Sequence, residues 1–386
     1  MIRVGFVLGQ FAQGWMGGVN YFRNLIHAIG SVPDRTIEPV LIVPPSTPRT
    51  LIAAFPAVEV LRTRMIDRPG GLARRAISRV LNQDLLMERL LKAHAVDVLS
   101  HSPDLGHRSS FATAGWIGDF QHRRMPEFFS HAELAARDSA FRETAKNSSV
   151  LLVSSVDAQR DLEQFAPTAM SKSRVLHFTS GYGEASDPPT LPEIRHKYGI
   201  DSHYFHLPNQ FWAHKNHRVV IAALAVLKSR GAPPPLIICT GSTSDYRNPD
   251  YFEQLMRHVE SSKAGESFKV LGMVSYEDLC ALMRHSVAVI NPSRFEGWST
   301  TVEEAKSFGK KIILSDLPVH REQAPERGVF FSVDDADALA AAMERAMADH
   351  SLRDEQRFQS EATERLPERF VAFGRKYQEI IMSIPG

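Results

Sequence analysis

Residues 287–315 read VAVINPSRFEGWSTTVEEAKSFGKKIILS, and this stretch decides the fold. Its apolar start predicts a buried strand, a polar loop follows, a helix is expected over 301–308, and its apolar end predicts a second strand. Strand, helix and strand in this order predict a parallel pair joined by a crossover helix. Glu296 in the loop and Glu304 near the helix start then lie at the carboxyl edge of the sheet, where open α/β sheets bind ligands.

The same alternation of strands and helices runs along the whole chain. Apolar runs predict strands at 2–8, 40–43, 96–99, 150–153, 204–207, 236–240 and 268–271, and helical spacing predicts helices at 19–29, 216–230, 249–263, 276–285, 334–349 and 367–384. A segment rich in Gly, Ser and Pro at 180–192 is the best linker. The sequence therefore predicts an α/β protein with two Rossmann-like, doubly wound domains facing a cleft, over residues 1–190 and 191–386. Whether the last helix packs back on the N-terminal domain is left open.

Composition excludes several classes of protein. The chain has 386 residues, of which 43% are hydrophobic and 23% charged, as in ordinary globular proteins. Its net charge of +1 gives no electrostatic reason to expect a nucleic acid partner. Cys239 and Cys280 are too few for a disulfide framework, so a cytoplasmic protein is expected. No apolar run is long enough to predict a membrane-spanning helix.

The stretch from Arg62 to Arg79 has a strong local charge. It holds six arginines, which are opposed only by Asp67. One interpretation is a solvated helix face. The other is a basic amphipathic surface that contacts anionic lipid or an anionic acceptor, which would place the protein peripherally at the inner face of a membrane.

Backbone amides at the start of the helix after Glu296 are a second candidate feature. The N–H groups of Trp298, Ser299 and Thr300 are predicted to point toward the sheet edge and to form a site for phosphate oxygens. The alternative is a capping box, in which Glu303 or Glu304 only caps the helix.

The whole motif resembles the family-4 retaining glycosyltransferases of the GT-B fold. The matching positions are Pro292, Ser293, Glu296, Gly297, Glu304, Ala305 and Gly309. The resemblance implies that Glu296 contacts hydroxyls of a donor sugar, that Glu304 holds the ribose diol of a nucleotide, and that Trp298 forms a wall of the site. A carboxylate suits a diol, because it accepts two hydrogen bonds and the diol offers two.

A second match lies after the strand at 204–207. Many family members carry an Arg and a Lys five residues apart there, which implies that both meet the donor diphosphate. This chain has Lys215, but Gln210 occupies the Arg position, so one cation is expected where two are usual. Nearby histidines lack the matched carboxylate or Cys spacing of a metal site, and no metal is expected.

Glycines and one apolar residue complete the predicted donor site. Gly17 and Gly18 belong to an expected glycine loop over 14–18, which resembles the glycine loop of the family's N-terminal domain. Gly241 is expected to border the diphosphate, and Val274 to line the base pocket. The pattern is not the dinucleotide fingerprint, so no nicotinamide cofactor is predicted.

A polar segment in the N-terminal half supplies the last candidates. The resemblance implies that His122 reaches the donor sugar at the catalytic centre. Asp119, Arg123 and Arg124 beside it are candidate contacts for the diphosphate or for an acceptor. The alternative is a polar surface loop before a helix.

These observations predict a retaining glycosyltransferase in which His122, Lys215 and Glu296 are catalytic. It would use a nucleoside-diphosphate sugar as donor substrate, need no cofactor or metal, and modify a glycan or lipid-linked acceptor in cell-envelope polysaccharide or glycolipid synthesis. Two alternatives stay open. They are a non-catalytic nucleotide-sugar-binding or scaffold protein, and an epimerase on the same fold.

Overall fold

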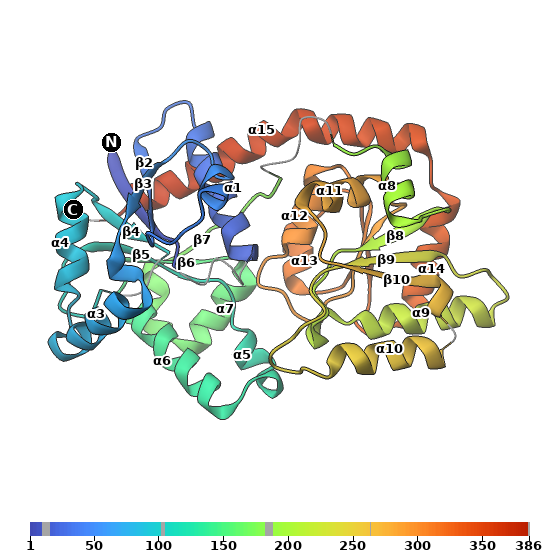
Figure 1. The fold of residues 1–386 in the computed structure, drawn as a ribbon, viewed down its shortest axis with the longest axis horizontal. Coiled ribbons are helices and arrows are strands. Elements are labelled where there is room, and N and C mark those ends of the chain that lie inside the picture. The colour runs from blue at the N-terminus through green and yellow to red at the C-terminus, as the bar shows by residue number, and fades with distance from the viewer. Residues whose placement is uncertain (10–15, 102–104, 182–187, 263, 385–386) are drawn as a thin grey trace. The chain divides into compact units, whose positions relative to one another are not determined.

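The chain divides into two structural units, each built on one parallel sheet. The computed structural model describes residues 1–9, 16–101, 105–181, 188–262 and 264–384. The first unit is Met1–Tyr182 with Pro367–Gly386, and the second is Gly183–Leu366. Helices cover both faces of each sheet (Figure 1). The predicted pair of doubly wound α/β domains is confirmed.

The first unit has a seven-stranded sheet in the order β3-β2-β1-β4-β5-β6-β7. Its strands are β1 (Ile2–Val7), β2 (Ile37–Val43), β3 (Glu59–Arg62), β4 (Val98–Ser100), β5 (Ala112–Ile117), β6 (Val150–Val153) and β7 (Ser173–Val175). Its helices are α1 (Met16–Ser31), α2 (Arg49–Ala53), α3 (Arg68–Leu81), α4 (Leu85–Ala93), α5 (Gln121–Arg124), α6 (His131–Asn147) and α7 (Val156–Phe165).

The second unit has a six-stranded sheet in the order β10-β9-β8-β11-β12-β13. Its strands are β8 (Tyr204–Leu207), β9 (Leu236–Thr240), β10 (Phe268–Gly272), β11 (Val289–Asn291), β12 (Ile312–Ser315) and β13 (Gly328–Phe331). Its helices are α8 (Leu191–Tyr198), α9 (His217–Ser229), α10 (Tyr251–Ser261), α11 (Tyr276–His285), α12 (Thr300–Ser307), α13 (Pro318–Gln323) and α14 (Ala336–Ala348), and α15 (Leu352–Met382) begins in this unit.

Alternating side chains on the strands of the second unit enter two different cores. On β9, Ile237 and Cys239 pack into the cluster formed with α9, α10 and α14, whereas Ile238 packs into a cluster with α8 and α11. On β12, Ile313 joins the first face, and Ile312 and Leu314 pack against α11 and α12 on the other. A strand buried on both faces is apolar throughout, which is why these runs were recognisable in the sequence.

The last helix is longer than predicted. The sequence predicts a helix over 367–384. The structure instead has one helix over Leu352–Met382 with Pro367 inside it. Pro367 is also the residue at which the chain passes from the second unit back to the first.

In the first unit, α15 packs closely on α1. Buried Phe370, Phe373 and Tyr377 follow helical spacing, and the Tyr377 hydroxyl donates to the Ser100 hydroxyl at 2.7 Å. A Cβ atom on Gly374 would collide with the backbone carbonyl of Ala28 in α1. The two helix backbones are therefore as close as a glycine permits.

Gly374→Ala should lower the free energy of unfolding by about 1–3 kcal/mol, because the methyl group forces α15 away from α1. Gly30→Ala is the matched control, since Gly30 is an exposed helical glycine with open space around its Cβ position. That substitution should be neutral or stabilise by up to ~1 kcal/mol. Chemical denaturation measures both, and equal effects of the two substitutions would contradict the packing described.

Candidate functional site

The topology of the second sheet places a site at the carboxyl ends of β8 and β11. The chain builds β8, β9 and β10 toward one edge and then returns to add β11 on the other side of β8. The connections after β8 and β11 therefore leave in opposite directions and open a crevice, which is where ligands bind in this class of sheet. Lys215 follows β8 and Glu296 follows β11, so both flank this switch point.

Lys215 and Glu296 form an ion pair, with 2.7 Å between Nζ and Oε1. Their side chains are only 16% and 10% exposed. The Ser293 hydroxyl also donates to Oε1 of Glu296, at 2.7 Å. Burial alone would raise the pKa of Glu296, but the charge of Lys215, with these hydrogen bonds, brings it below its ordinary value. Glu296 is therefore an ionised carboxylate at neutral pH.

Buried amide and hydroxyl groups hold the loop that carries Glu296. Asn291 Oδ1 accepts from Asn209 Nδ2 at 3.0 Å, and Asn291 Nδ2 donates to the Ser299 hydroxyl at 2.9 Å. His320 Nδ1 lies 2.7 Å from the carbonyl oxygen of Ser315 and so carries the proton. Sequence analysis did not select Asn291, Asn209 or His320, although Asn291 lies in the segment that carries the motif.

Glu304 has a different charge state from Glu296. It lies on α12 and is 5% exposed. Burial raises its pKa to about 8, against a hydrogen bond from the Tyr276 hydroxyl that lowers it. Glu304 is therefore protonated at neutral pH in the unliganded protein. One buried carboxyl group of each charge state lies in this region of the second unit.

The capping alternative for this helix is wrong. Ser299 is the N-cap of α12, its side chain makes no capping hydrogen bond, and Thr300 already lies inside the helix. Glu303 instead forms an ion pair with Lys306 at 3.1 Å and accepts from Gln323 Nε2 at 3.0 Å.

The predicted amide site is altered at one of its three donors. The Ser299 N–H donates to Gln323 Oε1 at 3.1 Å and is not the free phosphate donor that the sequence suggested. Trp298 is 8% exposed and Thr300 begins α12. Gln323 comes from α13, so only tertiary structure reveals this contact.

The loop after β9 lies against the loop after β8. The Ser242 N–H donates to Gln210 Oε1 at 2.7 Å, so the side chain at the Arg position of the motif joins the two loops. Gly241, between β9 and this contact, has φ +138° and would place a Cβ against the carbonyl of Asn209. Val274 follows β10 and packs partly on the cluster formed with α8.

Nearby histidines are buried structural groups. His206 Nε2 lies 2.9 Å from the Thr240 hydroxyl, and the His217 ring stacks on Phe211 at 4.4 Å between centroids. Burial lowers the pKa of both imidazoles to about 3. Within the described residues, no group of three His, Cys, Asp or Glu side chains is arranged to hold a metal ion.

In the first unit, the predicted glycine loop is partly a helix. Gly17 and Gly18 lie in the first turn of α1, whereas residues 14 and 15 fall outside the described residues. The corresponding switch point of this sheet lies between β1 and β4. His101, which follows β4 with φ +53°, was missed by sequence analysis. Its Nε2 lies 2.7 Å from the Tyr21 hydroxyl.

His122 lies on α5 in an aromatic environment. Its ring packs edge-to-face on Phe141 at 4.9 Å, and Nε2 lies 3.1 Å from Asp138 Oδ1. Burial lowers its pKa, although the hydrogen bond to Asp138 raises it. The imidazole is therefore a neutral group oriented by a carboxylate. Its contact with a sugar stays a prediction.

The polar residues around His122 already have partners. Arg123 pairs with Asp138 at 3.2 Å, and Arg124 lies 3.0 Å from Asp157 and 2.9 Å from Asp161. Asp119 accepts from the backbone N–H of Gln121 at 2.9 Å. Any contact of these arginines with a diphosphate or an acceptor has to compete with the carboxylates.

Comparison with known proteins identifies the type of domain. Residues 192–365 match the family described as Glycosyl transferases group 1. No curated protein gave a match. These residues include Lys215, Glu296 and Glu304, so the candidate site lies within the matched segment.

Solved structures resemble the whole chain at low sequence identity. A glycosyltransferase from Rickettsia africae has 15% identity and a TM-score of 0.70, with 99% of this chain and 98% of that chain covered. HepE from Anabaena, solved with UDP and glucose, has 16% identity and a TM-score of 0.71, with 99% and 100% covered. Sucrose-phosphate synthase from Thermosynechococcus elongatus has 13% identity and a TM-score of 0.64, with 100% and 95% covered. At these identities the likenesses show the shared fold, and the family match covers residues 192–365.

Lys215→Met should destabilise the protein by about 3–5 kcal/mol, because it leaves the buried Glu296 carboxylate without its cation. Adding Glu296→Gln should recover most of this loss, since the buried charge is then removed as well. Arg365→Met is the control, because Arg365 pairs with Glu326 at the surface, where such pairs contribute about 0–1 kcal/mol. Urea denaturation gives the three values. A loss for Lys215→Met no larger than that of the control would mean that the pair is not buried in solution.

Proposed function

We propose that this protein is a retaining glycosyltransferase that moves a sugar from a nucleoside-diphosphate sugar to an acceptor hydroxyl. The observation that carries this proposal is the buried Lys215–Glu296 pair at the switch point between β8 and β11. It lies in the segment that matches the glycosyltransferase family. The Anabaena relative was solved with UDP-glucose, which supports a nucleotide-sugar donor.

Each side chain of the second unit has a role that suits its chemistry. Lys215 would bind the diphosphate and stabilise the negative charge that grows on it as the sugar leaves. Glu296, already ionised, would accept hydrogen bonds from hydroxyls of the donor sugar. Glu304 would hold the ribose diol. Once a phosphate takes over Lys215, Glu296 becomes free to bind the sugar, so donor binding would exchange one ion pair for an ion pair with phosphate and hydrogen bonds from the sugar.

The chemical step in this proposal depends on positioning and electrostatics. The acceptor hydroxyl would attack on the face of the sugar that the diphosphate leaves, which retains the anomeric configuration. His122 would shape the reaction face. The fixed cation would do the work that a metal ion does in other transferases, so we propose that transfer is metal-independent.

Two other functions make different predictions for a donor panel. A transferase releases nucleoside diphosphate in proportion to acceptor. An epimerase isomerises the donor without acceptor, and a non-catalytic binder leaves it unchanged. We therefore propose to incubate the protein with UDP-, GDP- and ADP-sugars, with chelator present, and to score donor binding by thermal shift and turnover by release of nucleoside diphosphate. The proposal would be overturned if the protein bound none of these donors.

Binding of the nucleoside diphosphate should release about one proton below pH 8, because the ribose diol donates to the ionised form of Glu304. The pKa of about 8 then predicts that affinity rises as the pH increases from 6 to 8. Glu304→Gln should remove this pH dependence and weaken binding about tenfold or more, since each lost hydrogen bond to a charged acceptor costs about 1.5–3 kcal/mol. Calorimetry in two buffers of different ionisation enthalpy counts the protons. Binding by the wild type with no proton release would contradict the ribose role.

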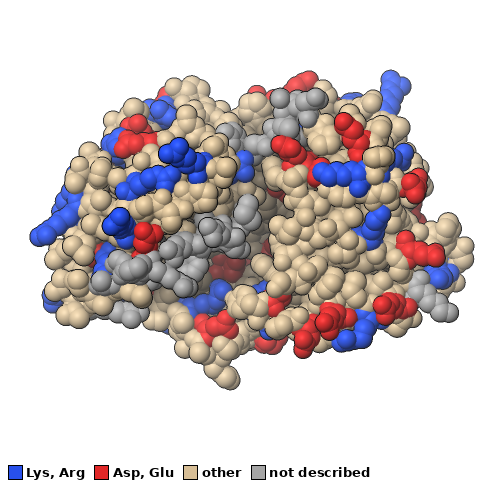
Figure 2. Space-filling view, in the orientation of Figure 1, with Lys and Arg blue, Asp and Glu red and all other residues tan. Residues whose placement is uncertain are grey.

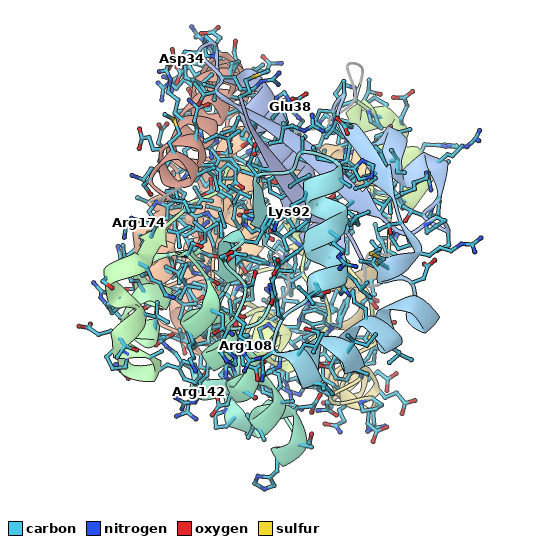
Figure 3. All side chains as sticks on the ribbon, turned by 90° about the vertical axis from the view of Figure 1, so that its left-hand side faces the viewer. Asp34, Glu38, Lys92, Arg108, Arg142 and Arg174 are labelled. Carbon is cyan, nitrogen blue, oxygen red and sulfur yellow. The ribbon has the colours of Figure 1, made fainter. Side chains whose placement is uncertain are left out.

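The acceptor in this proposal is a glycan or lipid-linked molecule at an anionic membrane surface, in cell-envelope synthesis. The support comes from α3, which carries Leu72, Ile77 and Val80 with exposed fractions of 61%, 46% and 82%. Figure 3 views the first unit from the side on which α3 and α4 lie at the surface, with Lys92 labelled on α4. Arg64, next to α3, is exposed. Apolar side chains beside basic ones suit the lipid interface.

Two of the arginines in this stretch already have partners, and one of these partners is a carboxylate. Arg74 pairs with the buried Asp84 at 3.4 Å, and Arg62 donates to the carbonyl oxygens of Pro45 and Thr47. On the face seen in Figure 2, acidic and basic side chains are intermixed on the second unit. No helix in the described part of the chain is both long and apolar enough to span a bilayer.

The protein should sediment with vesicles that contain anionic lipid and not with neutral ones, and salt should weaken the binding. Arg64→Glu together with Val80→Ser should reduce the bound fraction several-fold, because each basic residue near such a surface contributes about 1 kcal/mol. Arg353→Glu, an exposed position on α15, changes the net charge equally and should leave binding unchanged. Equal loss with both variants, or no binding to either vesicle, would leave a protein whose acceptor is soluble.

A further inference from the structure

Gln210 removes one of the two cations that the motif would bring to the diphosphate. Its side chain does not compensate, because Oε1 accepts the Ser242 N–H at 2.7 Å. A second backbone contact, from the Phe211 N–H to the carbonyl of Ser242 at 2.9 Å, fixes the same junction. The loop after β9 is therefore fastened directly beside the loop that carries Lys215.

The loop after β9 brings another cation, Arg247. Its Nε and Nη2 donate to the two carboxylate oxygens of Asp245, at 3.0 and 3.3 Å. Both side chains are buried, with exposed fractions of 8% for Arg247 and 4% for Asp245. A two-point contact of this kind fixes the plane of a guanidinium and leaves it charged.

Trp212 connects Arg247 to Lys215. The Arg247 guanidinium lies over the Trp212 ring, 4.9 Å from its centroid, and Trp212 Nε1 donates to the carbonyl of Ser244 at 3.3 Å. The carbonyl of Trp212 accepts the N–H of Lys215 at 2.9 Å. Trp212 therefore contacts Arg247 through its ring and Lys215 through its backbone carbonyl.

The charges of both cations affect the pKa of His214. Its ring lies 5.7 Å from that of Trp212, and its pKa is well below the ordinary value. Burial is the main cause, and the charges of Lys215 and Arg247 each lower it further. Both cations are thus near one imidazole at the carboxyl edge of β8 and β9.

We propose that Arg247 is the second cation for the donor diphosphate and takes the place that Gln210 leaves vacant. This inference rests on the proposed function. A guanidinium suits the role because its five N–H donors fan out in one plane and can serve a carboxylate and a phosphate together. Asp245 and Trp212 orient it before the donor arrives, so little rotamer freedom is lost on binding.

The alternative is a purely structural role for Arg247, in which it joins the loop after β9 to Trp212 and does not contact a ligand. The two roles differ in one measurable ratio. A diphosphate ligand loses affinity when the cation is removed, whereas a nucleoside monophosphate, which lacks the second phosphate, loses less. If the role is purely structural, removing Arg247 weakens the binding of diphosphate and monophosphate equally, because it changes the shape of the whole loop.

The experiment compares UDP with UMP, GDP with GMP, and ADP with AMP, by calorimetry on the full chain. Arg247→Met should weaken diphosphate binding about tenfold to hundredfold and monophosphate binding by less than threefold. Arg247→Lys keeps the charge without the planar fork and should fall between Arg247→Met and the wild type. Arg257→Met is the control, because Arg257 is an exposed arginine on the adjacent α10 that pairs only with exposed Glu253 in the described structure.

A double variant distinguishes the loss of a cation from a change in the shape of the loop. Adding Gln210→Arg to Arg247→Met returns a cation to the motif position and should restore at least half of the lost discrimination between diphosphate and monophosphate. Equal losses for both nucleotides, or no loss, would overturn the role of Arg247. Failure of the wild type to bind any of the six nucleotides would overturn the proposed function itself, which makes the two failures distinguishable. If Arg247→Met does not fold, the ratio of diphosphate to monophosphate affinity measured for Arg247→Lys distinguishes the two roles.

Discussion

The ion pair between Lys215 and Glu296 joins the loops that follow β8 and β11, and the candidate site depends on it. A buried ion pair is rarely more stabilising than apolar side chains of the same volume, because both charges lose their hydration. This pair lies above a sheet whose strands are apolar on both faces, where an apolar contact would have been available. Ser293 and Asn291 hold the loop of Glu296 in place. Stability alone does not account for the pair, whereas the exchange of one of its charges with a ligand, as in the proposed function, would.

The two carboxyl groups in the motif share a helix–loop segment but not a charge state. Glu296 is ionised because Lys215 compensates for its burial, and Glu304 is neutral because burial is opposed only by a hydroxyl group. Environments that separate two pKa values in this way are typical of sites where each group has its own task. In the proposed function, the ionised group pairs with a cation or accepts from sugar hydroxyls, and the neutral group becomes a strong acceptor for a diol only after it releases its proton to solvent.

The sequence predicted those features that depend on local pattern. The strands at 150–153, 204–207 and 236–240 and the helix at 276–285 have the predicted bounds, because each is an apolar run or an amphipathic stretch between clear turn signals. The strand at 112–117 was missed, since Ala and Gly dilute its apolar pattern. The continuation of α15 through Pro367 was missed because tertiary packing overrides the local preference of proline.

The positions of the candidate site residues were predictable from the sequence, but the contacts between them were not. The motif gave the positions of Lys215, Glu296 and Glu304, and the fold placed them at the carboxyl edge of the second sheet. It could not give contacts between segments that are distant in sequence, such as Gln323 on the Ser299 amide. It also could not show that Gly17 and Gly18 are helical.

Charge at a sheet edge belongs to the edge rather than to one position in the chain. In a parallel sheet the carboxyl ends of neighbouring strands meet, so a side chain lost from the loop after one strand can be replaced from the loop after the next. Gln210 and Arg247 follow adjacent strands, β8 and β9, and the hydrogen bond from Ser242 to Gln210 joins their loops. A glutamine at 210 therefore does more than delete a cation, because the amide that replaces it holds in place the loop that carries Arg247. Loss of a motif residue in such a fold is better judged by which neighbouring loop it now contacts than by its absence from the motif.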